Sequence, residues 1–600
     1  MLYTLGGTFY TFQWDILLLE TGYLTALCFA PWQSLRLNDV GSVDDNNQKQ
    51  IGCKESDTLG AWPLRFLLFK LMLMSGVVKI QADCPTWKNL TALEYHFATQ
   101  CLPGPFAWHA HQLHPLILRL GVAATFVIEI PAAFLLVFPM TTVRRVGAWL
   151  QILLQVLIIG TGNYNFFNLL TIALCLPCII GGGNVKTRNK LQLQVMQVVS
   201  CVVFLAWSCK MFEIYNEQHP IHHERQVIGL RLALSKYDCN TLMEKTVPVC
   251  CVSVVAFTIL GGVHLMAKET STKRHLGLLI NTLVCSYCVI ATAEPLFGLT
   301  RSMKQPILFE RILQAVPHGN IMSPSGYGLF RRMTGLGRVP TSGSGESYGW
   351  AGVSPSVVAR PEIITEAVIE DAKHNEEHVT INTENEELWQ ELNFRWKPGN
   401  ITHWPSQVAP HQPRFDWRMW FAALGSYQHN PWLVSFLDKL LDGCPVVIDL
   451  LDEPELLSGE RRIKKVRASL YEYDFTRLDT DWSCGIPGAT ILQNEHFWGF
   501  PTQVWTRKFV RSYLPPIDKN ILRLNGFEDR TCIAQKNRCS DVPTKAKAPC
   551  QVAAWIRGWN RPCLLSVLVL AFCLRRGCWR SSKLVARSAG PPKVKEVKAD

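Results

Sequence analysis

Gly160-Thr-Gly-Asn-Tyr-Asn-Phe-Phe-Asn168 interrupts an apolar stretch that occupies residues 147–181. One crossing of a bilayer takes about 20 apolar residues. The stretch is too long for one crossing and short for two, so it predicts a tight helical hairpin, or a re-entrant pair, that turns within the interruption. Asn163, Asn165 and Asn168 cannot face lipid with unpaired amides. We expect them to tie the turn inside a polytopic membrane protein rather than to bind a ligand.

Apolar runs joined by short polar loops fill the first half of the chain, so residues 1–297 are interpreted as a multi-span transmembrane domain. The basic residues of its short loops set the orientation, because such loops stay in the cytosol. Arg144 and Arg145 form one such loop. Counting spans from it places the loop at 83–115, the loop at 212–246 and the region 298–560 on the lumenal side. The expected spans are residues 12–30, 62–82, 116–139, 147–160 with 165–180, 192–211, 247–267 and 276–296.

Two sequons and two cysteines fall on the side that is predicted to be lumenal. Asn89-Leu-Thr91 and Asn400-Ile-Thr402 predict N-linked carbohydrate on Asn89 and Asn400. Cys84 and Cys101 bracket one lumenal loop. Because that compartment is oxidising, we expect them to form a disulfide.

The second half of the chain is polar and changes its pattern to that of strands. Residues 298–360 are a Gly/Ser/Pro-rich connector, and residues 361–525 predict a β-rich (α+β) domain with helices at 416–424 and 431–441. In the strand expected at 465–475 the apolar residues move to the other face of the strand after Leu470, which predicts a β-bulge. Further strands are expected near residues 363–368, 378–382 and 392–396. A Cys-rich linker (526–562), a possible final transmembrane segment (563–580) and a basic cytosolic tail (581–600) follow.

Composition excludes several classes of function. The net charge is +12, but the residues from 575 onward hold eight Lys or Arg and only two acids, which is typical of a cytosolic tail after a span. No nucleic-acid-binding module accompanies this charge. We therefore predict no nucleic-acid partner and no cofactor.

Motif-like patterns in the chain lack the context that their chemistry requires. Gly345-Glu-Ser-Tyr-Gly349 has neither the strand before Ser347 nor the helix after it that a nucleophile elbow needs. Cys175-Leu-Pro-Cys178 and Cys285-Ser-Tyr-Cys288 lie in spans rather than beside a sheet. No ligand array accompanies the histidines, so no catalytic or metal residue is predicted. These histidines are His109, His111, His114, His222 and His223.

Charged residues inside the predicted spans allow two interpretations, because each is costly in lipid unless it is paired. Lys70 and Glu129 lie deepest, whereas Arg65, Lys79 and Arg119 lie near span ends. Ion pairs between helices are the simpler interpretation. A substrate path is the other. The alternative function for the whole protein is an intramembrane enzyme acting on lipids or lumenal proteins, with Lys70, His109, His111 and Glu129 as its chemistry.

Aromatic residues gather between Trp389 and Trp432, where they form either a core or an exposed surface that binds other proteins. The segment 409–432 combines them with arginines, which are enriched at binding hot spots. We therefore predict that this segment forms or supports a client-binding surface. Its predicted contact residues are Arg414, Phe415, Trp417, Arg418, Trp420, Phe421, Tyr427 and Trp432.

Four unusual stretches resemble the lipase maturation factor family, with a pattern nearest its second member. They are Tyr95–Gln112, Gly162–Thr171, Tyr327–Gly335 and Val408–Gly425 with Asn430-Pro-Trp432, and the resemblance covers roughly residues 1–515. It implies a multi-pass endoplasmic-reticulum membrane protein of the secretory pathway with a lumenal C-terminal domain and no catalysis. The implied partners are newly made secreted lipases of the lipoprotein lipase type, the lipid bilayer and other lumenal folding factors.

Overall fold

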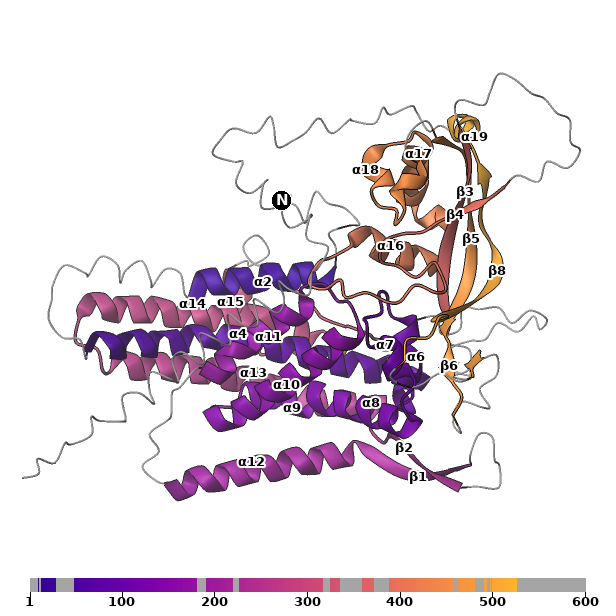
Figure 1. Cartoon of the computed structure of the whole chain (residues 1–600). Helices are drawn as coiled ribbons and strands as arrows, with labels where there is room; N and C mark the ends of the chain where they lie inside the picture. Colours follow the sequence, from indigo (N-terminus) through magenta and orange to yellow (C-terminus); the bar gives the residue numbers. More distant parts are fainter. Residues whose placement is uncertain are drawn as a thin grey trace, which may run out of the picture.

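In the computed structural model, a bundle of helices from the first half of the chain lies beside a C-terminal domain built on a four-stranded sheet (Figure 1). The predicted fold class, a polytopic helical membrane domain followed by a β-rich domain, is confirmed. Predictions on Ser347, on His222 and His223, on a strand at 378–382 and on the chain after residue 525 lie outside the described residues. The structure describes residues 9, 12–28, 48–180, 190–218, 226–316, 324–334, 359–371, 388–457, 461–480, 490–493, 497 and 499–525.

Five helical segments in the described part of the chain are long and apolar enough to cross a membrane. They are Leu59–Gln81 of α4 (Gln48–Gln81), α8 with α9 (Pro115–Glu129 and Pro131–Leu136), α10 (Thr141–Thr161), α13 (Lys236–Met266) and α14, whose bounds are Thr272–Phe297.

Three predicted spans correspond to α2 (Gln13–Cys28), α11 (Phe167–Ile180) and α12 (Lys190–Lys210). The first two helices are shorter than the five above, and in α12 the apolar segment is Gln194–Lys210. At 1.5 Å per residue α11 is about 21 Å long. It is therefore shorter than the hydrocarbon layer, which is about 30 Å thick.

The polar interruption forms the turn between α10 and α11, and all three of its asparagines are buried. Asn165 adopts a left-handed backbone (φ 52°), and its side-chain oxygen accepts a hydrogen bond of 2.9 Å from the Phe167 amide, which caps the start of α11. The Asn168 amide donates to Gln155 Oε1 of α10 at 2.8 Å. Asn168 thus links the two helices near the turn, while Asn165 caps the second of them.

The turn pairs with a loop at residues 100–106. The Gly104 amide donates to the Thr161 carbonyl at 2.9 Å, and Pro103 and Gly162 form an isolated antiparallel bridge. A Cβ atom on Gly104 would lie 2.8 Å from the Gly162 amide nitrogen, so this close approach requires glycine. The loop follows the short helices α5 (Pro85–Lys88) and α6 (Ala92–Thr99) and precedes α7 (Ala107–His111).

A β-hairpin that the sequence analysis missed joins α12 to α13. Its strands, β1 (Phe212–Gln218) and β2 (Gln226–Leu232), pair antiparallel along their full length. The helix α15 (Ile307–Ala315) follows the bundle.

The C-terminal sheet has the order β4-β3-β5-β8 and is antiparallel throughout. Its strands are β3 (Arg360–Asp371), β4 (Gln390–Leu392), β5 (Arg461–Phe475) and β8 (Trp505–Ile517). The upper part of one face is covered by helices (Figure 1). The other elements of the domain are α16 (Arg414–Ala423), α17 (Pro431–Leu441), α18 (Pro445–Ile448), α19 (Lys519–Leu524), two 3₁₀ turns (Tyr427–His429 and Pro454–Leu457) and the short parallel pair β6 (Arg477–Leu478) and β7 (Ile491–Leu492).

The predicted bulge in β5 is confirmed, because the register with β8 shifts between Leu470 and Tyr471. Before the shift, Val466 and Ala468 pack in the core beneath α16 and α17. After it, Phe475 and Tyr473 pack with side chains of α6 and α7 from the membrane domain. One strand therefore contributes to two cores and joins the two domains.

Ion pairs between helices account for the deep charges of the bundle. Lys70 Nζ lies 2.6 Å from Glu20 Oε1, and the Tyr327 hydroxyl donates to the other oxygen of this carboxylate at 2.6 Å. Lys79 Nζ lies 2.6 Å from Glu129 Oε2. Lys70 and Glu129 are thus each held in an ion pair between helices, as the simpler interpretation expects.

Candidate functional site

The predicted client-binding segment lies at the junction of the two domains. Trp417 and Trp420 of α16 are only 4% and 7% exposed, so the prediction of an exposed aromatic surface is wrong for both. Their burial has a clear cause, since α16 packs against the start of α2. Trp14 contacts Trp417 edge to face at 4.8 Å between ring centroids, and Tyr164 of the α10–α11 turn lies 6.0 Å from the same ring.

Two arginines of the segment support this packing. Arg414 forms a bidentate ion pair with Asp15 of α2, at 2.6 and 2.8 Å, which is the strongest geometry for such a pair. The Arg418 guanidinium lies 4.6 Å over the ring of Phe12. Both side chains therefore position α16 on the membrane domain.

The remaining predicted contact residues are less buried. Phe421 is 39% exposed. Trp432 is partly buried and contacts Phe415 edge to face at 5.8 Å, while Tyr427 lies 6.4 Å from Tyr513. These three side chains form the accessible part of the predicted surface.

A groove of about 600 Å³ opens beside the start of α16, and we call it the junction groove. Arg414 and Phe415 are the only residues of the predicted contact set that line it. Sequence reasoning missed the others, although His411 and Gln412 lie in the stretch that carries the family resemblance. The further lining residues are Phe9, Arg395, Trp396, His411, Gln412, Pro413, Asp416, Asp449 and Leu450.

The groove is lined by charged, polar and apolar side chains, and a buried amide lies in its wall. Both polar atoms of the Gln412 side chain are buried, and neither has a hydrogen-bond partner among the described residues. A primary amide offers one acceptor and two donors, which matches the N–H and C=O of an extended peptide. Trp396, Phe415 and Leu450 supply the apolar contacts beside it. If the Gln412 side chain turns into the groove, the arrangement can bind a segment of another polypeptide by its backbone and by one or two apolar side chains.

One wall of the groove is fixed by a buried carboxylate. Asp416 Oδ1 accepts hydrogen bonds from the amides of Trp396 at 3.2 Å and Lys397 at 3.0 Å. Burial raises the pKa of the Asp416 carboxyl to about 6, against the opposing effect of these hydrogen bonds.

Asn163 of the turn contacts the segment that leads into the groove. Its side-chain oxygen accepts from the amides of Val408 at 2.7 Å and Ala409 at 3.0 Å, and its nitrogen donates to the carbonyls of Pro103 at 2.9 Å and Ser406 at 2.8 Å. This asparagine therefore ties the C-terminal domain to the membrane domain, a role that the sequence analysis did not foresee.

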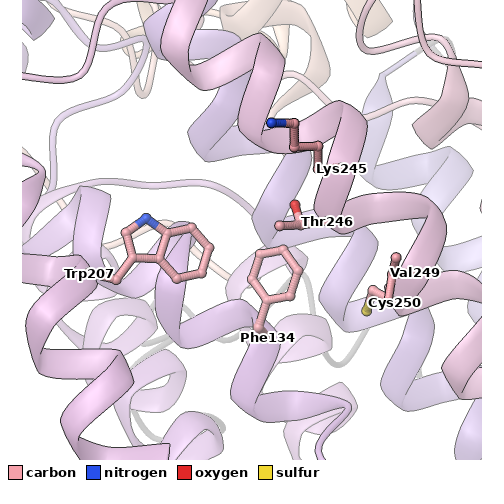
Figure 2. A pocket seen from close by; sticks show the side chains of 6 residues that line it. All are labelled: Phe134, Trp207, Lys245, Thr246, Val249 and Cys250. Carbon is pink, nitrogen blue, oxygen red and sulfur yellow. The ribbon is translucent and has the colours of Figure 1, made fainter.

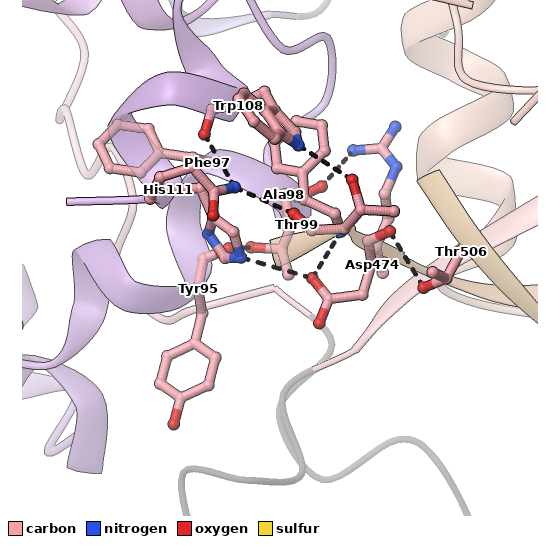
Figure 3. A network of polar contacts seen from close by, with 12 residues as sticks. Tyr95, Phe97, Ala98, Thr99, Trp108, His111, Asp474 and Thr506 are labelled. Carbon is pink, nitrogen blue, oxygen red and sulfur yellow. Dashed lines mark hydrogen bonds and ion pairs between the residues drawn. The ribbon is translucent and has the colours of Figure 1, made fainter. Parts of the chain in front are cut away.

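Two further contacts hold the C-terminal domain on the loop at 83–115. The Trp108 indole donates to Thr476 Oγ1 at 3.1 Å, in the network of Figure 3. Arg360 of β3 is fully buried, donates to the Cys101 carbonyl at 2.9 Å and pairs with Glu362. The junction thus contains both polar and apolar contacts, and its buried Arg360 is paired with Glu362.

The predicted disulfide between Cys84 and Cys101 is wrong, because both thiols are free. The Cys84 sulfur lies 3.3 Å from the Thr86 hydroxyl at the start of α5. The Cys101 carbonyl is held by Arg360, and its side chain is buried. Cys444, in the C-terminal domain, is disulfide-bonded.

The two sequons differ in accessibility. Asn400 is exposed, and its side-chain oxygen accepts from both the amide and the hydroxyl of Thr402, at 3.0 and 2.9 Å. Asn89 is half-buried at the end of α5, and its sequon partner Thr91 is buried. Of the two, Asn400 offers the better acceptor.

The four residues of the alternative enzyme hypothesis have different neighbours. Lys70 pairs with Glu20, and Glu129 with Lys79. His109 lies among aromatic rings, with Trp404 at 5.4 Å, and burial lowers its pKa. His111 is buried 5.5 Å from the Phe475 ring, and its pKa is held well below the usual value, mainly by burial. Catalysis needs such groups to converge, and each of these four contacts a different set of side chains.

The other charged and metal-type candidates have structural roles. Arg65 donates twice to the Pro177 carbonyl in the last turn of α11, at 3.0 and 2.8 Å, and Arg119 lies 3.5 Å from Glu94. Among the residues that the structure describes, no three His, Cys, Asp or Glu side chains are grouped as a metal site would require.

Comparison with known proteins identifies the family. The model of the lipase maturation factor transmembrane domain matches residues 1–182, and that of the lipase maturation factor C-terminal domain matches residues 344–515. The chain belongs to the lipase maturation factor family. The stretches at 95–112, 162–171 and 408–425, on which the resemblance was recognised, all lie inside these matches.

Relatives of the second type are more similar to the chain than those of the first. It is 32% identical to lipase maturation factor 2 of Xenopus tropicalis, over 88% of this chain and 70% of that protein. Human lipase maturation factor 2 is 31% identical, over 88% and 69%, whereas human lipase maturation factor 1 is 23% identical, over 88% and 70%. No solved structure matches the chain.

The burial of Trp417 predicts how two variants of α16 will differ. Trp417→Ala should strongly reduce the amount of folded protein, because truncating a buried tryptophan costs about 3–5 kcal/mol. Phe421→Ala is the matched control, since this ring is 39% exposed, and it should leave the amount nearly unchanged. Size-exclusion chromatography of the full chain in detergent, with tryptophan fluorescence as the signal, measures both. Equal yields of the two variants would contradict the packing of α16 on α2.

Proposed function

We propose that this protein is a membrane factor of the endoplasmic reticulum that helps newly made secreted lipases, lipoprotein lipase among them, to fold, mature and be secreted. In this proposal it catalyses no reaction. The junction groove binds an extended segment of the client, and Phe421, Tyr427 and Trp432 contact the client around it. Membership of a family whose members are called lipase maturation factors is the observation that carries the proposal.

The chemistry of the groove supports a binding role. Folding clients expose backbone amides and apolar side chains together, and the free amide of Gln412 beside Trp396 and Leu450 complements both. The aromatic residues Trp, Tyr and Phe have the types found at interface hot spots. Lys70, His109, His111 and Glu129 each contact a different set of side chains, which gives no support to catalysis.

The charges of the bundle support a lumenal C-terminal domain. Arg145 lies near the start of α10, and its Nε donates to the Ile179 carbonyl at the end of α11 at 3.0 Å. This end of the helix pair is opposite to the turn that contacts the C-terminal domain through Asn163. Because basic loops remain in the cytosol, the domain falls on the lumenal side, where the disulfide at Cys444 and the exposed Asn400 are both expected.

Glycosylation tests this topology. In cells, Asn400 should carry high-mannose carbohydrate, because it is exposed on the side that we assign to the lumen. Endoglycosidase H should then lower the apparent mass, and Asn400→Gln should abolish most of that shift. Asn89→Gln, at the half-buried sequon, should have a smaller effect. The absence of any shift in the unmodified chain would contradict the lumenal assignment.

A charge placed in the groove tests client binding. Leu450→Arg introduces a cation into the groove wall, whereas Val446→Arg is a matched control on the exposed face of α18, where Val446 is 49% exposed. We expect Leu450→Arg to reduce co-purification and secretion of lipoprotein lipase several-fold, since desolvating a buried charge costs several kcal/mol. Val446→Arg should change neither. With both variants equally abundant, unchanged lipase secretion in Leu450→Arg would overturn the role of the groove.

A further inference from the structure

A second groove, of about 350 Å³, lies between α9, α12 and α13 inside the membrane part of the molecule. Its volume is near the lower end of the range for small-molecule sites, about 300–1,000 Å³. Neither the client proposal nor the junction of the two domains uses it. Figure 2 shows its lining side chains: Phe134, Trp207, Lys245, Thr246, Val249 and Cys250.

The surroundings of this groove are apolar. Val249 at its floor is 65% exposed, and the outward face of α12 presents Val198 at 62% and Val202 at 58%. These helices belong to a bundle with several spans long enough to cross a bilayer, so such exposed aliphatic faces contact acyl chains rather than water. A ligand of this groove therefore enters it from the lipid bilayer.

The lining of the groove is almost wholly apolar, and a cation lies at its edge. α13 has 31 residues and is therefore about 46 Å long, against a hydrocarbon layer of about 30 Å, so its first turns reach the headgroup region. Lys245 lies at the boundary, directly before the apolar run that starts at Val247. Lys245 is exposed, and among the described residues its amine has no ion-pair or hydrogen-bond partner.

The spacing of the lining residues along α13 places their side chains at different depths in the membrane. Lys245 and Val249 are four residues apart on α13, as are Thr246 and Cys250, so each pair shares one face and is separated by one turn of about 5.4 Å. The cation therefore lies one turn nearer to the headgroups than the apolar floor. Trp207 adds a second donor, because its indole nitrogen is turned toward the side of the groove on which the Lys245 amine lies (Figure 2).

We propose that this groove binds one anionic phospholipid of the bilayer. The phosphate lies on the Lys245 amine and the Trp207 indole N–H. One acyl chain lies over Phe134, Val249 and Cys250. The choice of an anionic ligand rests on the charge of Lys245, since a cation at the edge of an apolar groove attracts an anion, and the phosphate of a phospholipid lies at this membrane depth.

The test uses the full chain, purified in a neutral detergent and mixed with phosphatidylglycerol, phosphatidylcholine or oleate of matched chain length. Native mass spectrometry counts the bound lipid. The unmodified protein should retain one phosphatidylglycerol in preference to phosphatidylcholine, and Lys245→Gln should weaken this binding about fivefold. Lys245→Arg keeps the cation and should preserve binding. Val249→Trp fills the floor and should abolish it.

The control variant is Lys210→Gln, because Lys210 lies at the end of α12 outside the groove. It should bind phosphatidylglycerol like the unmodified protein. Equal loss in Lys210→Gln and Lys245→Gln would mean that surface charge alone attracts the lipid and would overturn the proposal. So would unchanged binding in Lys245→Gln, equal retention of phosphatidylcholine, or oleate displacing phosphatidylglycerol at equal concentration. Thermal unfolding of each variant establishes that it is folded. If Val249→Trp does not fold, the comparison of Lys245→Gln with Lys245→Arg still decides whether the charge of residue 245 binds the lipid.

Discussion

The relation between the two domains depends on the side-chain amide of Asn163. Its oxygen accepts from the amides of Val408 and Ala409, and both hydrogens of its nitrogen are donated, to Pro103 and Ser406. The amide is 2% exposed, so none of these groups can exchange its partner for water. A buried polar group that loses its partner costs about 1–3 kcal/mol. One side chain in a membrane turn thus fixes the loop at 103 and the segment at 406–409.

Contacts of another kind surround this one. The aromatic rings of α2 and α16 exclude water from the junction, and the Arg414–Asp15 pair orients α16 on them. Arg360 and Glu362 are paired with no exposure at all. Buried ion pairs contribute little net stability, but breaking one is costly, so they select one arrangement of the domains over others. The shape of the junction groove depends on this arrangement of the domains, because α16 forms part of the groove wall.

Features that depend on local pattern could be predicted from the sequence. The polar residues at 160–168 predicted the turn, since amides cannot face lipid, and the phase change after Leu470 predicted the bulge. The hairpin β1–β2 was missed because its two strands lie in a loop between predicted spans. The burial of Trp417 could not be predicted, because tryptophan is equally typical of a hot spot and of a junction between domains. Asn163 and Val408 are 245 residues apart in the sequence, and no local sequence pattern predicts a contact between residues so far apart.

The most direct measurement of this account is hydrogen exchange at the backbone amides of Val408 and Ala409 in the full chain. In Asn163→Ala both amides lose their buried acceptor, so their exchange should accelerate about tenfold or more, as a loss of about 1–3 kcal/mol of protection implies. Asn168→Ala is the matched control, because among the described residues the Asn168 side chain bonds to Gln155 of the same helix pair and not to the C-terminal domain. It should leave both amides protected. Unchanged exchange at Val408 and Ala409 in Asn163→Ala would contradict the central role of this side chain.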